Sequence, residues 1–418
     1  MSFSTPLSFL SPVAKALSGT WTRRLLFEVK RATQATLQRL LSIWRRPLDR
    51  AETVAYLGDH VSLAHRPASL PVSTYRSPVQ LGTELRLDVL NNSVLKNSAL
   101  NSHSNNSSNN TLGESLLHFE PDYVWDITAR GSIRQLALTR SGTPLVNGHL
   151  LLDVDYGTVA GFKDMPVTLR HQHYPVIIAP WSHFFGQYYT FVLWVLAKLC
   201  RMQAAIEPAL WQRAKVCYPR FNTAYETQYL EKLGLPLENV IDTRTSRARL
   251  STDRLILANN QTRVNRISPA DVALLRQRFL PAQQAVAGRR LFFPRRGRRV
   301  LKNEAELRIV LEKYGFESIE DTPRSVDEQI ALFQSAACIV AVHGAGLSNL
   351  VWCSAGTHVV ELFYRGYTKP GFYYLCQLLG LQYDCLFDRS RVTDSFSNQF
   401  CDLEIDPTAL AALLERAL

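Results

Sequence analysis

One short segment of the chain combines the residue types that bind an anion. It reads His343-Gly344-Ala345-Gly346, and it lies between an apolar run and a predicted short helix. Glycines let a ligand approach the backbone closely, and the free N–H groups and dipole of a helix N-terminus favour a phosphate. A tight strand-to-helix turn, with His343 simply exposed, is the alternative interpretation. On its own, a G-x-G pattern does not decide between the two.

A basic cluster follows another predicted strand, over residues 290–293. It contains Arg295, Arg296, Arg298 and Arg299. The carboxyl ends of parallel strands share one edge of a sheet, so we expect these arginines near the glycine segment. Two phosphate-binding features on one edge suit a diphosphate. A loop of solvated arginines is the alternative.

Glu361 ends the next predicted strand, over residues 358–363, at the same expected edge. A carboxylate in an apolar strand is costly unless it is paired. In dinucleotide folds an acidic residue at this position binds ribose hydroxyls. The segment from Gly344 continues to Asn349 without the third glycine of the nicotinamide fingerprint. These features favour a nucleotide diphosphate other than NAD.

Two carboxylates after an apolar run form a candidate metal site. Asp153 and Asp155 make a D-x-D pattern, and their hard oxygens suit Mg²⁺ or Mn²⁺ with a bound diphosphate. The pattern is common by chance. Because Tyr156 and Gly157 follow it, a strand end and turn is the competing interpretation.

The elements that must position these residues alternate along the second half of the chain. Apolar strands, each followed by a helix with an N-cap or capping-box signal, are typical of a parallel sheet covered on both faces. The predicted helix starts are Ser268-Pro269, Asn303 with Glu306, Ser325 with Glu328, and Asp406-Pro407. We predict a Rossmann-like domain over 266–418 and another α/β domain over 121–265. A long apolar helix is expected over 183–202.

The remaining segments differ in composition. Residues 1–50 read as a basic amphipathic helical extension, with the helix over about 20–44, and residues 91–112 as an Asn/Ser-rich flexible loop. Residues 20–46, which include this helix, either lie on an anionic membrane as a peripheral contact or pack on the protein with a solvated face.

Charge and cysteine content narrow the partners and the compartment. Residues 1–50 and 289–302 each carry an excess of seven positive charges, and the rest of the chain carries about −3, which gives the formal net charge of +11. Neither segment has the interleaved aromatics or finger spacing of a nucleic-acid binder, so we expect no nucleic acid. The seven cysteines lie in apolar runs without C-x-x-C pairs, which indicates buried thiols in a reducing, cytoplasmic setting rather than disulfides or zinc. No stretch is long enough to span a bilayer, and the N-terminus lacks a secretory pattern.

The segment from Arg290 to Phe363 resembles the catalytic region of glycosyltransferase family 61, which includes capsular-polysaccharide-type enzymes and xylosyl- and N-acetylglucosaminyltransferases. The shared features are a strand-end arginine, Asn-Glu opening a helix, Glu328-Gln329, His-Gly-Ala-Gly-x-x-Asn and a strand with Glu-Leu. The resemblance implies a GT-B fold, with two Rossmann-like domains facing across a cleft and the acceptor on the N-terminal one. It implies donor-binding roles for Arg295, Arg299, Asn303, His343, Gly344, Ala345, Gly346, Asn349 and Glu361.

The activity that the resemblance implies is inverting transfer from a nucleotide-sugar, such as a UDP-sugar, to a glycan hydroxyl, without a cofactor or an essential metal. Arginines and backbone amides would stabilise the leaving diphosphate. A base must take the proton of the acceptor hydroxyl. His183, Asp153, Asp155 and His343 are the candidates.

Two rival functions stay open at this point. One is a metal-dependent GT-A type transferase that uses Asp153 and Asp155. The other is a non-enzymatic protein that binds anionic surfaces through residues 20–46 and 289–302.

Overall fold

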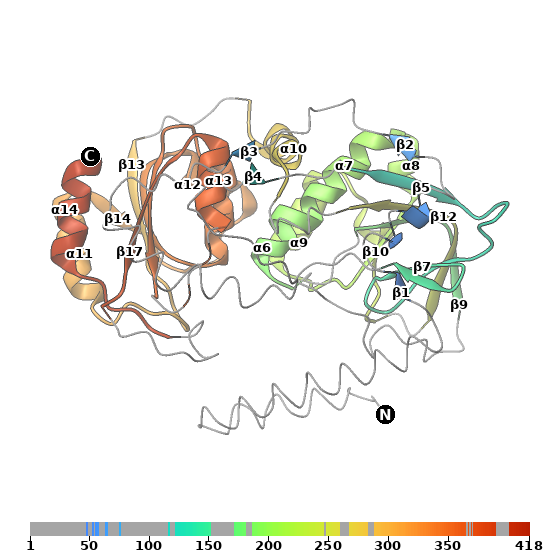
Figure 1. The fold of residues 1–418 in the computed structure, drawn as a ribbon, viewed down its shortest axis with the longest axis horizontal. Helices are drawn as coiled ribbons and strands as arrows, with labels where there is room; N and C mark the ends of the chain where they lie inside the picture. The colour runs from blue at the N-terminus through green and yellow to red at the C-terminus, as the bar shows by residue number, and fades with distance from the viewer. Residues whose placement is uncertain are drawn as a thin grey trace, which may run out of the picture.

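The computed structural model describes residues 122–151, 171–180, 186–245, 248–259, 267–282, 288–364, 371–389 and 401–418, together with Tyr367, Lys369 and short pieces between residues 47 and 117. The predicted helix within 1–50 and the loop at 91–112 lie outside these residues. Figure 1 shows two α/β units side by side, each built on its own sheet.

The second unit contains the parallel sheet that the sequence predicts. In the described residues its strands are β13 (Arg289–Phe293), β14 (Phe316–Ser318), β15 (Ala336–Val342), β16 (His358–Phe363) and β17 (Gln382–Phe387). They are all parallel and lie in the order β14-β13-β15-β16-β17. This is a doubly wound order, in which the chain reverses direction between β13 and β15. The fold therefore places its topological switch point at the ends of these two strands.

Alternation along β15 explains why its sequence is apolar throughout. Ile339 and Ala341 pack on one side, into the core that faces the first unit, whereas Cys338 and Val340 pack on the other side. Helices α11 (Glu304–Lys313) and α14 (Pro407–Ala417) cover the outer face of the sheet, and α12 (Val326–Gln334) and α13 (Gly371–Leu379) lie on the inner face (Figure 1). A strand covered on both faces has no solvent side for polar residues.

The sheet of the first unit is mixed, which corrects the expectation of a second Rossmann-like sheet. Its strands are β1 (Pro47–Leu48), β2 (Leu63–His65), β5 (Val124–Thr128), β6 (Leu136–Leu138), β7 (Pro144–Val146), β8 (His149–Leu151), β9 (His171–Ala179), β10 (Lys215–Tyr218), β11 (Val240–Asp242) and β12 (Arg249–Ala258). Strands β12, β9, β10 and β11 are parallel neighbours, but β5 and β6 pair antiparallel with β12. Hairpins join β6, β7 and β8, and strands joined by tight turns must run antiparallel. A separate pair is formed by β3 (Tyr75–Arg76) and β4 (Leu116–Leu117).

The long apolar helix predicted over 183–202 is continuous from Tyr188 to Ala205. It consists of α6 (Tyr188–Thr190), the π-helical η3 (Phe191–Leu196) and α7 (Ala197–Ala205). The other helices of this unit are α8 (Pro208–Arg213), α9 (Ala224–Lys232), η4 (Leu237–Asn239) and α10 (Pro269–Phe279). All six residues of η3 are buried, as the unbroken apolar sequence predicts.

Helix start signals in the sequence have mixed outcomes. Ser268 caps α10, and Ser325 with Glu328 forms the predicted capping box of α12. Asn303 precedes α11 but makes no side-chain cap, because its amide bonds to the backbone of Ile405 instead.

One apolar core joins the two units. It includes buried residues of η3, α7 and α10 together with residues of α12, α13 and the 3₁₀-helix η5 (Ala345–Trp352). Helix α10 contacts both α7 and η5, and Figure 1 shows it between the two sheets. Polar contacts add to this core, since Lys232 pairs with Asp327 at 2.5 Å and Gln228 accepts a bond from the Val326 amide. Within the described part of the chain, no helix is long and apolar enough to cross a bilayer.

Candidate active site

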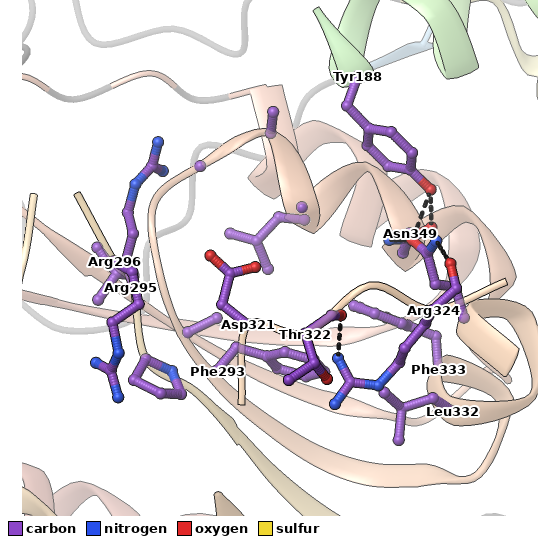
Figure 2. A pocket seen from close by; sticks show the side chains of 18 of the residues that line it. Tyr188, Phe293, Arg295, Arg296, Asp321, Thr322, Arg324, Leu332, Phe333 and Asn349 are labelled. Atoms are coloured by element: carbon purple, nitrogen blue, oxygen red, sulfur yellow. Dashed lines mark hydrogen bonds between the residues drawn. The ribbon is translucent and has the colours of Figure 1, made fainter. Parts of the chain in front are cut away.

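A cavity of ≈ 500 Å³ lies at the switch point of the second sheet. Its walls are the loops that follow β13, β14 and β15, and Tyr188, Ala224 and Tyr225 of the first unit close one side. Figure 2 shows Arg295 and Arg296 at one end, Arg324 and Asn349 at the other, and the Asp321 carboxylate between them. The cavity lies where ligands bind in open parallel sheets, outside the carboxyl ends of the strands.

Arg295 lies half-buried at the end of β13, as its place after the strand predicts. Its Nη1 donates a 2.8 Å hydrogen bond to the carbonyl oxygen of His343. No carboxylate in the described part of the chain lies within ion-pair distance of this guanidinium. Burial, together with the nearby Arg299 and Arg298, lowers the pKa of Arg295 to about 10. A half-buried cation without a carboxylate partner is costly, so this site suits an anionic ligand.

The glycine turn lies directly beside Arg295. A Cβ atom on Gly344 would come within 1.8 Å of Arg295 Nη1, so only glycine leaves room for the guanidinium to bond at this turn. Gly346 differs, because a Cβ there would meet no atom within 4 Å. Since Gly344, Ala345 and Gly346 all line the cavity, open space covers the backbone at the start of η5. The predicted anion cradle is thus brought together with the predicted arginine.

The other arginines of the cluster have different environments. Arg296 pairs with Glu304 at 2.6 Å and with Glu320 at 3.4 Å, so its charge is already compensated. Arg299 adopts a left-handed backbone conformation with φ of 57° and lies over the Tyr367 ring at 5.4 Å. Its Nε is buried without a hydrogen-bond partner in the described residues, and burial lowers its pKa. Arg299 does not line the cavity, and no described carboxylate lies within ion-pair distance of its guanidinium.

Asn349 and Gln329 connect the cavity to the first unit. The Tyr188 hydroxyl, on α6, donates to Asn349 Oδ1 at 2.7 Å and to Gln329 Oε1 at 3.1 Å. Trp352 Nε1 also donates to Asn349 Oδ1, at 3.2 Å. Burial raises the pKa of Tyr188 to about 12, so this hydroxyl stays a donor at neutral pH. The side chain of Asn349, which was predicted to bind the ligand, lines the cavity but also holds the two units together.

His343 and Glu361 form a buried pair on the far side of the glycine turn. His343 Nδ1 lies 2.5 Å from Glu361 Oε1, and the Tyr383 hydroxyl donates to Glu361 Oε2 at 2.6 Å. Glu361 is completely buried. A ribose contact from Glu361, as its strand-end position predicts, would require one of these bonds to break. In this structure the partners of Glu361 are two side chains of the protein, His343 and Tyr383.

The remaining predicted site residues have two different outcomes. Asn303 bonds to Ile405 and does not line it. His183, Asp153 and Asp155 lie outside the described residues, so their roles stay predictions.

Sequence reasoning missed part of the cavity wall. Asp321, Thr322 and Arg324 belong to the loop after β14, and Arg324 Nη1 donates to the carbonyl oxygens of Glu320 and Thr322. Because β14 neighbours β13, the same carboxyl-edge argument applied to the strand at 316–319 would have found this loop.

Comparison with known proteins gives a family match. A search of curated proteins finds no similar sequence. The family described as Glycosyltransferase 61 matches residues 148–360, just over half of the chain. This segment includes Arg295, the glycine turn and Asn349, and it ends one residue before Glu361. The chain therefore belongs to glycosyltransferase family 61.

Proposed function

We propose that this glycosyltransferase moves a sugar from a nucleotide-sugar donor, a UDP-sugar in the simplest case, to a hydroxyl of a glycan acceptor, in the synthesis of a capsule-like polysaccharide or another glycoconjugate. The reaction inverts the anomeric centre and needs no metal ion. The two units act as the halves of a GT-B enzyme, with the donor on the second and the acceptor on the first.

One observation carries this proposal. Arg295, half-buried and without a carboxylate partner in the described residues, lies beside an open glycine turn at the switch point of a parallel sheet. We assign the donor diphosphate to Arg295 and the backbone of residues 345–346, with Arg299 as the second cation. The nucleoside extends toward Asp321, whose carboxylate can accept hydrogen bonds from ribose hydroxyls.

The charges of this site suit a leaving diphosphate. As the bond between the sugar and the phosphate breaks, negative charge grows on the phosphate oxygens. Preorganised cations and amide dipoles stabilise that charge in the transition state. In this proposal, Arg295 and the turn take the place of the divalent ion that metal-dependent transferases use.

We expect turnover that is insensitive to chelation. A thermal-shift and hydrolysis panel of nucleotide-sugars, run with and without EDTA, should show a donor-dependent rise in Tm, because a ligand that binds only the folded state stabilises it. Asp153→Asn should keep full turnover. Loss of turnover in EDTA that Mn²⁺ restores would contradict metal independence and favour the rival site at Asp153 and Asp155.

Gly346→Ala tests the backbone cradle without disturbing the protein. The added methyl group meets no protein atom within 4 Å, so Tm should not change. It enters the space assigned to the diphosphate, and we expect UDP to bind roughly tenfold more weakly. Gly288→Ala is the matched control, since its Cβ also meets no atom within 4 Å but lies at the opposite end of β13. Isothermal titration calorimetry measures both variants, and equal UDP affinity in the two would refute the cradle.

The cellular setting follows from the thiols and the basic segment. Six of the seven cysteines are buried, and burial raises the pKa of Cys200 and Cys353, so these thiols are unreactive. Buried thiols favour a reducing compartment. We propose a cytoplasmic enzyme that contacts the membrane surface through residues 20–46.

A further inference from the structure

The side chain of His343 lies in a polar and aromatic enclosure that the proposed diphosphate site does not use. Its ring stacks on Phe363, with centroids 4.9 Å apart, and contacts Tyr367 and Phe372 at 5.7 and 5.6 Å. The backbone of His343 is fixed as well, because its N–H donates to Leu362 and its carbonyl oxygen accepts from Arg295. The imidazole is therefore held in one orientation.

Glu361 determines which nitrogen of the ring carries the proton. An ionised carboxylate can only accept hydrogen bonds, so the 2.5 Å contact requires His343 Nδ1 to be the donor. Neutral His343 then has its lone pair on Nε2. Nε2 has no hydrogen-bond partner in the described residues, and it keeps some exposure to solvent. The ring thus presents a basic nitrogen at its open end.

Tyr383 fixes the carboxylate in turn. Its hydroxyl donates to the second oxygen of Glu361 at 2.6 Å. Burial, followed by the charge of Glu361, raises the pKa of Tyr383 well above its usual value, so the hydroxyl keeps its proton and remains a donor. The three side chains form a chain of hydrogen bonds from β17 through β16 to the end of β15.

The His343 ring lies near the first unit. Phe372, which contacts the His343 ring, also contacts Tyr189 of α6 with centroids 5.7 Å apart. The glycine turn beside Arg295 begins at the residue after His343. His343 is therefore next to the assigned diphosphate and close to the unit that the proposed function gives to the acceptor.

We propose that His343 is the catalytic base and that Glu361 and Tyr383 are its positioning residues. This inference rests on the proposed function. Nε2 of His343 takes the proton of the acceptor hydroxyl while the acceptor oxygen forms a bond to the anomeric carbon. The bond from that carbon to the phosphate oxygen breaks, and its electron pair leaves with the nucleoside diphosphate. Glu361 stabilises the imidazolium that forms, as a buried carboxylate does in other histidine bases.

The charged and titratable groups around the ring come from several elements. Glu361 faces Nδ1 from β16, and Tyr383 faces Glu361 from β17. Tyr367 lies against the ring, Arg299 lies over Tyr367, and Arg295 bonds to the His343 carbonyl oxygen. Among the described residues, Glu361 is the only carboxylate that contacts the imidazole.

Turnover and UDP affinity of three variants test the proposal. We expect His343→Asn to lower kcat by about 10²–10⁴-fold and to bind UDP as the wild type does. Glu361→Gln should lower kcat by at least about tenfold and move the acid limb of the kcat profile to lower pH, because the imidazolium loses its compensating charge. Tyr383→Phe should give a smaller loss and move the acid limb to higher pH, because a carboxylate without this hydrogen-bond donor attracts the imidazolium more strongly. It removes only a hydroxyl group, so it keeps the test available if the buried Glu361→Gln variant does not fold.

The chain offers a matched control on the same two strands. His358 Nε2 lies 2.7 Å from Asp384 Oδ2, and His358 begins β16 at its amino end, three residues before Glu361. His358→Asn disrupts a similar histidine–carboxylate pair, so it should lower Tm without a change in kcat or in the acid limb.

Three results would overturn the inference. The first is a kcat of His343→Asn within threefold of the wild-type value. The second is a parallel loss of UDP affinity and kcat in His343→Asn, which would make His343 a donor-binding residue only. The third is Glu361→Gln and Tyr383→Phe profiles identical in shape to that of His358→Asn. Wild-type turnover with a nucleotide-sugar is measured first, and its absence with every donor would overturn the proposed function together with this inference.

Discussion

Arg295→Ala is expected to lower kcat/KM for the donor by about 10²–10³-fold, which is the typical cost of removing one preorganised donor from a developing anion. Arg295 contributes a charge that forms no ion pair with a carboxylate of the described residues, so its loss removes the main attraction for the diphosphate. The fold should not suffer, because the guanidinium makes a single hydrogen bond to the described residues, to the His343 carbonyl oxygen. Steady-state kinetics and Tm measure the two effects separately.

Arg289→Ala is the control for this experiment. Arg289 lies at the opposite end of the same strand and forms an exposed pair with Glu317. Exposed ion pairs contribute about 0–1 kcal/mol to stability, and this one is far from the cavity along β13. Arg289→Ala should therefore turn over the donor at the wild-type rate. Normal UDP binding and turnover in Arg295→Ala would refute the assignment of the diphosphate.

Arg201→Ala should destabilise the protein by about 3–5 kcal/mol, because it leaves a buried charge without its ion-pair partner. Arg201 is buried on α7 and bonds in a bidentate manner to Asp271 of α10, through Nε at 3.0 Å and Nη2 at 2.5 Å. Its Nη1 bonds to Asn259, and Asp122 lies 3.4 Å from Nη2. The variant leaves two carboxylates in a core without their cation. Urea unfolding measures the loss.

The destabilisation of Arg201→Ala should depend on pH. Burial raises the pKa of Asp271 from its ordinary value of 3.8 to about 6. Proton uptake by Asp271 therefore stabilises the folded state fully below about pH 4, and this contribution is lost as the pH rises through 6. Without Arg201, the ionised carboxylate of Asp271 costs more free energy in the folded state. The loss of unfolding free energy in the variant should therefore be larger at pH 8 than at pH 5. Equal losses at the two pH values would contradict this explanation.

Arg289→Ala again provides the comparison. Its bond lengths to Glu317, 3.0 and 2.5 Å, equal those of the buried pair, but its side chain is 42% exposed against 4% for Arg201. The two variants thus differ in burial and in the additional contacts of Arg201 with Asn259 and Asp122. If Arg289→Ala unfolds as early as Arg201→Ala, desolvation of the stranded carboxylates is not the cause.

Local signals were enough to predict the second sheet. The apolar strand before His343, the capping box at Ser325 and the Pro407 helix start all lie where the sequence places them. These signals depend on neighbours within a few residues, which a single sequence contains. The order of the strands in the mixed first sheet depends on pairing between distant segments, such as β5 with β12, and has no comparable local signal.

The site was predictable in its residue types but not in its pairings. Glu361 was expected to need a partner, and it has two, but they are His343 and Tyr383 from neighbouring strands. Four arginines follow β13, and only contacts with Glu304 and Glu320 distinguish Arg296 from Arg295. Arg201 was hidden in a helix that reads as apolar, because its partners Asp271 and Asn259 lie more than fifty residues away.

A crystal structure of the protein with UDP tests the central claim most directly. We expect the diphosphate within hydrogen-bond distance of the Arg295 guanidinium and of the backbone amides at residues 345–346, with the nucleoside beside Asp321. A diphosphate bound away from the ends of β13 and β15, or held by a metal ion at Asp153 and Asp155, would contradict it.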